Sequence, residues 1–213
     1  MDNAFLRYAP DRWYLHEERV HCPLMMGSTN NEFRIAPHAE DDATLMAYAA
    51  KIPGLDQAAF LKQFTSPATK ESIAREGDVN AIEFAVRAAG MRTNETIYAY
   101  EFSAEIPGWD HPGAFHSVDL WFFFETLAKC WRPFTGKHYD LARQMCDYLV
   151  NFVRGGDPNG MGTDGTPLPY WPVLKAEAPV FQSFGDTVKP VQSPASPLTK
   201  LLLDAYLSRS KPD

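Results

Sequence analysis

The stretch Ile97-Tyr98-Ala99-Tyr100-Glu101-Phe102 is rich in β-branched and aromatic side chains, a composition typical of a β-strand. A second strand is predicted at Pro23-Leu24-Met25-Met26-Gly27, a short apolar run that a glycine ends. Residues 180–184 predict a third, short strand. Segments with helical patterns separate these strands along the chain, an order that favours parallel pairing. The sequence therefore predicts an α/β fold with few, mainly parallel strands flanked by helices.

The clearest helix is predicted over residues 137–154, where apolar side chains recur at helical spacing. Its apolar stripe consists of Leu141, Met145, Leu149 and Phe152. On the opposite side we expect Asp140, Arg143 and Asp147, at spacings of three and four that allow ion pairs. Gly155-Gly156 supplies the left-handed conformation that ends a helix.

Further helices are predicted at about 41–51, 56–64, 79–89, 118–130 and 197–208. The first three fall within a helical insertion at about 41–91, where Asp41-Asp42 and Asp56 are suitable N-caps. The helix over 118–130 carries four consecutive aromatic residues, Trp121-Phe122-Phe123-Phe124. Because neighbours on a helix point in different directions, we expect most of these rings in the core.

Charge and hydropathy restrict the partners of this protein. The 213 residues include 20 Lys and Arg against 27 Asp and Glu, a formal net charge of -7. An acidic chain without a basic run argues against a nucleic-acid or anionic-membrane partner. The apolar stretch around residues 120–124 is far shorter than the roughly 20 residues that cross a bilayer.

Three cysteines, Cys22, Cys130 and Cys146, cannot all pair with one another, and no Cys-x-x-Cys occurs. We interpret them as buried thiols in a reducing compartment. Residues 1–13 contain charges and no apolar core of a signal peptide. These features predict a cytoplasmic protein.

Two residues follow predicted strands at positions suited to chemistry. His116 lies between a Gly- and Pro-rich loop and a predicted helix start, downstream of the strand 97–102. In doubly wound folds, sites gather outside the carboxyl ends of strands, so His116 is a candidate general base. Glu32 occupies the matching place after the first strand and could orient an imidazole. The alternatives are a helix-capping or surface histidine and a solvated loop carboxylate.

Other chemistries have weaker support. His111, His116 and Asp119 could be drawn around a metal, but no further ligand is near and no zinc spacing occurs, so we expect no metal and no cofactor. Asp119 is expected instead to cap a helix or to accept a buried hydrogen bond. The nucleophile elbow Gly-x-Ser-x-Gly is absent, and Ser183 lacks both the first glycine and a following helix.

Three stretches, in this order, resemble the type-B carboxylesterases, which include the bacterial para-nitrobenzyl esterases and, more distantly, the cholinesterases. They are Met26-Gly27-Ser28-Thr29-Asn30-Asn31-Glu32, Tyr98-Ala99-Tyr100-Glu101-Phe102 and Gly113-Ala114-Phe115-His116-Ser117-Val118-Asp119-Leu120. Residues 151–160 and 170–172 resemble the C-terminal signature of that family, and the similarity extends from about Phe5 to the last helix. The resemblance implies an α/β-hydrolase fold and ester hydrolysis by a Ser–Glu–His triad, with Glu32 as the acid and His116 as the base.

The resemblance covers the C-terminal part of the family's catalytic domain. The nucleophile elbow and the oxyanion-hole glycines belong to the N-terminal part. Three positions depart from the family pattern: Ser117 and Asp119 replace the Gly and Glu common just after the histidine, and Phe33 replaces a frequent Gly after the acid. Because Asp is one methylene shorter than Glu, we expect the hydrogen bond from that position to be lost or rerouted.

Two functions remain open. In the first, residues 1–213 form a single C-terminal fragment of an esterase domain that acts on a small-molecule carboxylic ester once an N-terminal half supplies the nucleophile. The isolated chain is then expected to be inactive, and to pair with that half or self-associate, because part of a sheet leaves an edge uncovered. In the second, the chain is a catalytically inactive esterase-like module that acts in protein interaction.

Overall fold

The computed structural model describes residues 20–33, 42–64, 79–92 and 94–209. They fall into two compact units. The first, called here the sheet unit, consists of residues 21–33 and 94–194. The second, the helical unit, contains the described residues of segments 1–20, 34–93 and 195–213. Each unit has its own hydrophobic core.

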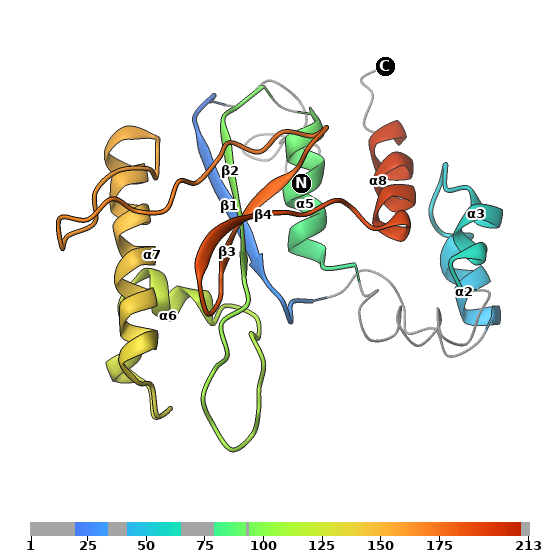
Figure 1. The fold of residues 1–213 in the computed structure, drawn as a ribbon. Coiled ribbons are helices and arrows are strands. Elements are labelled where there is room, and N and C mark those ends of the chain that lie inside the picture. Colours follow the sequence, from blue (N-terminus) through green and yellow to red (C-terminus); the bar gives the residue numbers. More distant parts are fainter. Residues whose placement is uncertain (1–19, 34–41, 65–78, 93, 210–213) are drawn as a thin grey trace, which may run out of the picture. The chain divides into compact units, whose positions relative to one another are not determined.

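Among the described residues, four strands form a sheet, in the order β1-β2-β3-β4 (Figure 1). They are β1 (Leu24–Thr29), β2 (Ile97–Phe102), β3 (Val180–Phe184) and β4 (Val188–Gln192). β1 pairs with β2 and β2 with β3 in parallel, while β4 returns antiparallel to β3. The prediction of an α/β fold with few, mainly parallel strands is confirmed, although β4 was not expected.

β1 and β2 pair without an offset. Leu24 lies opposite Ile97 at one end, and Thr29 lies opposite Phe102 at the other. Both strands therefore end at the same level, and the loops that follow them leave from one edge of the sheet. The loops after parallel strands are where α/β proteins place their sites.

Two helices and a short 3-10 turn follow β2 in the sheet unit. They are α6 (Asp119–Phe123), η1 (Leu127–Lys129) and α7 (Gly136–Gly155), and α6 and α7 lie together on one side of the sheet (Figure 1). The predicted continuous helix over 118–130 is wrong. The observed helix α6 ends at Phe123. Glu125 adopts a left-handed backbone conformation (φ 49°), which a right-handed helix cannot include.

α7 agrees with the predicted helix over 137–154, and Gly156 ends it in the left-handed conformation (φ 75°). Two expectations about its polar side chains are wrong. Asp147 is buried and accepts a hydrogen bond from the main-chain N–H of Thr163 at 3.0 Å. Arg143 pairs with Glu125 at 2.6 Å rather than with a carboxylate on its own helix. In both cases a loop beside the helix supplies the partner, which spacing along the helix cannot reveal.

The core of the sheet unit is built around Trp171, which is fully buried. Its Nε1 donates a hydrogen bond to the carbonyl oxygen of Ala99 on β2 at 2.9 Å. The main-chain N–H and carbonyl of Trp171 both bond to the side chain of Asn159, at 2.7 and 2.9 Å. Rings that contact the indole edge-on are Tyr98, Tyr100, Tyr148 and Phe184. The loop after α7 is thereby fastened to the sheet.

The run Trp121-Phe122-Phe123-Phe124 contributes mainly to this core, as predicted. Phe122 and Phe123 are buried and Trp121 is half-buried, whereas Phe124 is 62% exposed. The interpretation of the cysteines as buried thiols is wrong for Cys22, which is exposed in the irregular segment before β1. Cys130 and Cys146 are half-buried.

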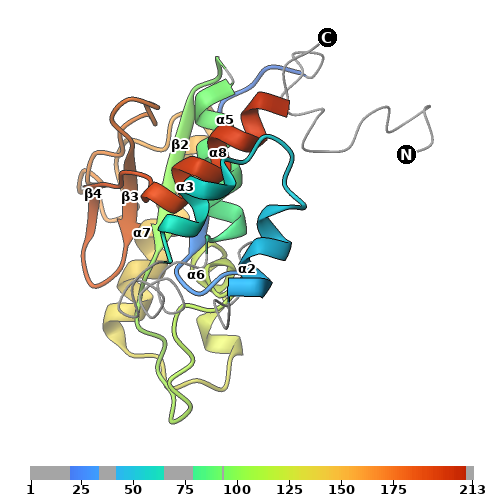
Figure 2. The same ribbon diagram turned by 90° about the vertical axis from the view of Figure 1, so that its right-hand side faces the viewer.

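Four helices make up the described part of the helical unit. They are α2 (Asp42–Ala49), α3 (Gln57–Lys62), α5 (Ala81–Arg92) and α8 (Pro197–Arg209). α3 packs against both α2 and α8 (Figure 2). The core that these helices share includes Leu45 of α2, Phe60 of α3 and Leu202 of α8. Asp56 caps α3, as predicted, by accepting a hydrogen bond from Ala59. The proposed cap at Asp41 lies outside the described residues.

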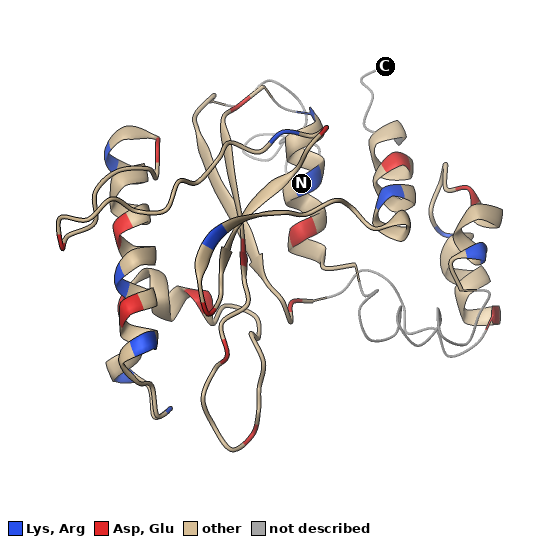
Figure 3. Cartoon of the chain, viewed as in Figure 1, with Lys and Arg blue, Asp and Glu red and all other residues tan. Residues whose placement is uncertain are grey.

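Charges of both signs are interspersed on the sheet unit. Figure 3 shows basic and acidic positions alternating along α7. The sequence of this helix includes Lys137, Asp140, Arg143 and Asp147, in that order. None of the helices in the described part of the chain is long and apolar enough to cross a membrane.

A substitution on β1 tests the packing of the sheet. Gly27 lies opposite Tyr100, and a Cβ atom on Gly27 would lie 2.3 Å from that ring. Gly27→Ala is therefore expected to lower the free energy of unfolding by about 1–3 kcal/mol, the usual cost of overpacking, in urea titrations followed by circular dichroism. The control is Gly155→Ala near the end of α7, where the added methyl would have no neighbour within 4 Å apart from the adjacent residues and the helix's own backbone. Equal stability of the two variants would contradict the packing described here.

Candidate active site

Glu32 and His116 meet at the edge of the sheet where β1 and β2 end. Glu32 lies three residues beyond Thr29, and His116 lies in the segment between β2 and α6. Nδ1 of His116 is 2.5 Å from Oε2 of Glu32. The structure thus brings together the two residues that the sequence analysis singled out.

Hydrogen bonds between the two loops set this geometry. The main-chain N–H of Asn31 donates to the carbonyl oxygen of Ala114 at 3.0 Å, and Oδ1 of Asn31 accepts from the N–H of Ala114 at 2.9 Å. Gly113 adopts a left-handed conformation (φ 63°), and a Cβ there would lie 2.5 Å from the same Oδ1. Glu32 and His116 are one and two residues beyond this junction.

The two side chains differ sharply in exposure. The side chain of Glu32 is 5% exposed, whereas that of His116 is 43% exposed. Oε1 of Glu32 accepts a long hydrogen bond, 3.4 Å, from the main-chain N–H of Thr29. The described residues give Nε2 of His116 no hydrogen-bond partner. A buried carboxylate therefore holds one nitrogen of an imidazole whose ring reaches solvent.

Phe33 covers part of the His116 ring. The two ring centroids are 4.4 Å apart with an angle of 37° between the planes. Phe33 is itself 65% exposed. The departure from Gly at this position thus adds an aromatic surface beside the imidazole.

Asp119 accepts the buried hydrogen bond that was one of its two expected roles. The hydroxyl of Tyr100 donates to Oδ2 of Asp119 at 2.7 Å, and Asp119 is buried. Burial raises the pKa of Asp119, the Tyr100 hydroxyl lowers it, and the nearby Glu32 charge raises it. Burial, together with Asp119 and Glu32, also raises the pKa of Tyr100. The shorter carboxylate at this position therefore bonds to β2.

Ser117 also departs from the resemblance, and its backbone explains why glycine suits this position. Its φ is 67°, in the left-handed region that glycine adopts without steric cost. The turn after His116 keeps this conformation even with a serine side chain.

The described residues contain no group of three or more His, Cys, Asp or Glu side chains that could hold a metal ion. His111, a possible ligand by its sequence position, lies at an exposed position of the loop. Ser183 lies within β3, opposite Glu101, and is buried in the sheet. Neither residue joins Glu32 and His116 in the structure.

The structure contains a second glutamate–histidine pair, which the sequence did not predict. Nδ1 of His21 lies 2.5 Å from Oε1 of Glu95, whose side chain is 4% exposed. These residues precede β1 and β2, so this pair is at the amino ends of the strands. Only the pair Glu32–His116 is at the carboxyl ends, where sites in such sheets gather.

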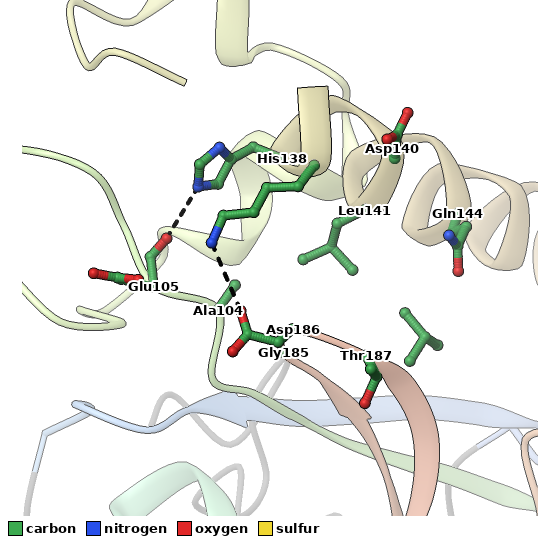
Figure 4. A pocket seen from close by; sticks show the side chains of 11 residues that line it. Ala104, Glu105, His138, Asp140, Leu141, Gln144, Gly185, Asp186 and Thr187 are labelled. Atoms are coloured by element: carbon green, nitrogen blue, oxygen red, sulfur yellow. Dashed lines mark hydrogen bonds and ion pairs between the residues drawn. The ribbon is translucent and has the colours of Figure 1, made fainter. Parts of the chain in front are cut away.

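A pocket of about 380 Å³ lies elsewhere in the sheet unit, between the start of α7 and the turn that joins β3 to β4 (Figure 4). Across it, Nζ of Lys137 lies 3.7 Å from Oδ1 of Asp186. His138, which is buried, bonds through Nε2 to the carbonyl oxygen of Glu105 at 3.2 Å. Neither Glu32 nor His116 lines this pocket, so it is separate from the acid–base pair.

Comparison with known proteins agrees with this arrangement. A model of the carboxylesterase family matches residues 1–197. The chain belongs to the carboxylesterase family. Human cocaine esterase is 34% identical over 93 residues, which cover 40% of this chain and 16% of that protein. Rat acylcarnitine hydrolase is 34% identical over 93 residues, which cover 39% of this chain and 15% of that protein.

Solved structures of esterases share the α/β-hydrolase fold of this member of the carboxylesterase family. One structure of PNB esterase superposes with a TM-score of 0.66 at 16% identity, over 92% of this chain and 41% of that one. An esterase from anaerobic Clostridium hathewayi, which can hydrolyze aliphatic aromatic polyesters, superposes with a TM-score of 0.51 at 22% identity, over 87% and 37%. The matched region is therefore about two fifths of the length of these structures.

The raised pKa of Asp119 gives a pH-dependent prediction. A carboxyl whose pKa is raised by folding stabilises the protein below its usual pKa and loses that contribution as the pH rises. Asp119→Asn keeps an oxygen that can accept the Tyr100 hydroxyl but does not titrate. The free energy of unfolding of the native chain, relative to this variant, should therefore fall between about pH 3 and pH 7.

Urea titrations at both pH values measure this difference, and Asp164→Asn is the matched control. Hydrogen bonds from Thr166 lower the pKa of Asp164, so the native chain should gain stability relative to that variant over the same pH range. The same pH dependence in both variants would contradict the account of Asp119.

Proposed function

We propose that this chain contributes the acid and the base of a Ser–Glu–His carboxylic ester hydrolase. Glu32 is the acid, His116 is the base, and the serine nucleophile and the oxyanion donors come from polypeptide outside these 213 residues. The substrate is a small-molecule carboxylic ester. The observation that carries this proposal is the 2.5 Å contact between the buried Glu32 carboxylate and Nδ1 of the exposed His116 ring.

The difference in exposure matches the two roles. A general base must reach a proton on a partner molecule or residue, and the 43% exposed ring of His116 leaves Nε2 accessible. The acid has only to hold Nδ1–H and to stabilise the imidazolium, which a 5% exposed carboxylate does from inside. The low local polarity around a buried carboxylate strengthens that interaction.

Ester hydrolysis would then proceed by acylation and deacylation of the serine. The serine oxygen bonds to the carbonyl carbon of the ester while its proton passes to Nε2 of His116. The same proton is given to the alcohol oxygen as the ester C–O bond breaks. Water then attacks the carbonyl carbon of the acyl-enzyme while one of its protons passes to Nε2. That proton is given to the serine oxygen as the acyl–serine bond breaks, which releases the carboxylic acid and restores the serine hydroxyl. Throughout, Glu32 keeps the proton of the neutral imidazole on Nδ1.

The names of the relatives favour esters as the substrate class. The human relative is a cocaine esterase and the solved neighbours are esterases. The Clostridium hathewayi enzyme hydrolyses polyesters. Because aligned segments span only part of each relative, neither substrate is carried over to this chain.

The chain alone is expected to be inactive. The purified 213 residues should neither hydrolyse p-nitrophenyl acetate nor be labelled by a fluorophosphonate, because a Gly-x-Ser-x-Gly elbow is absent from them. Joining them to, or mixing them with, a polypeptide that carries the elbow and the oxyanion donors of the family should restore both. Serine labelling of the 213 residues alone would overturn the assignment of the nucleophile to other polypeptide.

In the complemented enzyme, His116→Gln should lower kcat by roughly 10²–10⁴, the usual contribution of a general base. The matched control is His21→Gln, which removes the histidine of the other glutamate–histidine pair and should leave kcat unchanged. The rate of p-nitrophenol release from p-nitrophenyl acetate measures kcat of both variants. Complex formation without any ester hydrolysis, in the native chain as in the variant, would favour the non-catalytic interaction module instead.

A further inference from the structure

A single guanidinium group, that of Arg132, contacts both ends of the loop of residues 107–115, which leads to His116. Nη1 of Arg132 donates hydrogen bonds to the carbonyl oxygen of Pro107 at 3.0 Å and to Oδ1 of Asp110 at 2.9 Å. Nη2 donates to Oδ2 of Asp110, also at 2.9 Å. Two parallel bonds of this kind fix the angle as well as the distance between the groups.

The same guanidinium lies over the ring of Phe115, with its carbon 5.6 Å from the ring centroid. Phe115 is the residue immediately before His116, and its ring also packs edge-on against Trp121 at 5.7 Å. Arg132 itself lies beyond α6, outside the loop that it contacts. One side chain therefore connects Pro107 and Asp110, at the start of the loop, to Phe115, at its end.

The burial of Arg132 indicates that this orientation is fixed. Its side chain is 7% exposed, and its Nε has no hydrogen-bond partner among the described residues. Because a side chain with so little access to solvent has few other partners, the hydrogen bonds from Nη1 and Nη2 set the orientation of the guanidinium. Those bonds are the pair to Asp110 and the one to Pro107.

We propose that Arg132, together with Asp110, is a positioning residue for His116. By holding the loop at both ends, the pair keeps the imidazole of His116 within hydrogen-bond distance of Glu32. The catalytic meaning of this role rests on the proposed function, whereas the positioning itself is a property of the 213 residues. Lys at position 132 would keep the charge but lose the planar, two-pronged donor.

The test is the proton on Nδ1 of His116, observed by NMR in chain labelled with ¹⁵N-histidine. This proton, shared with Glu32, should give a downfield signal that is assigned by its absence in His116→Gln. We expect Arg132→Lys and Asp110→Asn each to abolish the signal by letting the loop leave Glu32, with the circular dichroism spectrum unchanged. The control, Arg143→Lys, breaks an ion pair with Glu125 that does not touch the loop and should keep the signal.

The outcomes separate this role from a general effect on folding. Asp110 is a partly exposed loop residue, so Asp110→Asn tests the proposal even if Arg132→Lys does not fold. A signal that persists in folded Asp110→Asn and Arg132→Lys overturns the proposal, and so does its absence from the native chain. A structural defect alone would instead broaden signals throughout the sheet unit in all variants that show it.

The complemented enzyme gives a second readout. A misplaced His116 should lower kcat by about 100-fold, the scale of loss from a shift of about 1 Å, while KM stays the same. Loss of the NMR signal in both variants, with no ester hydrolysis by the native complemented chain, would support the positioning role and contradict the proposed function. An unchanged kcat in both variants would overturn the positioning role while leaving the proposed function intact.

Discussion

The site depends on the parallel pairing of β1 and β2 in step. Because Leu24 lies opposite Ile97 and Thr29 opposite Phe102, the two strands end together and their loops leave from one edge. A shift of register by one residue would move the loops apart and turn every side chain of one strand to the other face. Beyond the ends of the strands, the bonds between Asn31 and Ala114 bring the two loops together.

Strands with a typical local composition could be predicted from the sequence, whereas β4, which contains a proline, could not. The strand 97–102 was predicted with its observed bounds because its side chains are typical of a buried strand. β4 was missed because Pro190 stands in its middle, and proline lacks the N–H that a central strand needs. It is tolerated because β4 is at the edge of the sheet formed by the described strands. The break after Phe123 was missed because the left-handed Glu125 is neither glycine nor asparagine.

For the site, the sequence could indicate positions but not contacts. Glu32 and His116 were singled out because each follows a strand, and the resemblance to carboxylesterases gave them roles. The paired hydrogen bonds from Arg132 to Asp110 could not be predicted, since they join residues 22 apart with no periodic pattern. The burial of Asp147 was missed for the same reason, because its partner Thr163 lies in a loop. Contacts of this kind are decided by tertiary packing.

In the proposed function, Glu32 acts on the reaction only through His116. Its most direct test is a double-mutant cycle in the complemented enzyme, with kcat for p-nitrophenyl acetate as the readout. If Glu32 serves only to hold and stabilise the imidazole, Glu32→Gln should slow the native enzyme but cause no further loss in His116→Gln, because residues that act as a unit are not additive. Losses that multiply in the double variant would mean that the two residues act independently and would contradict the claim.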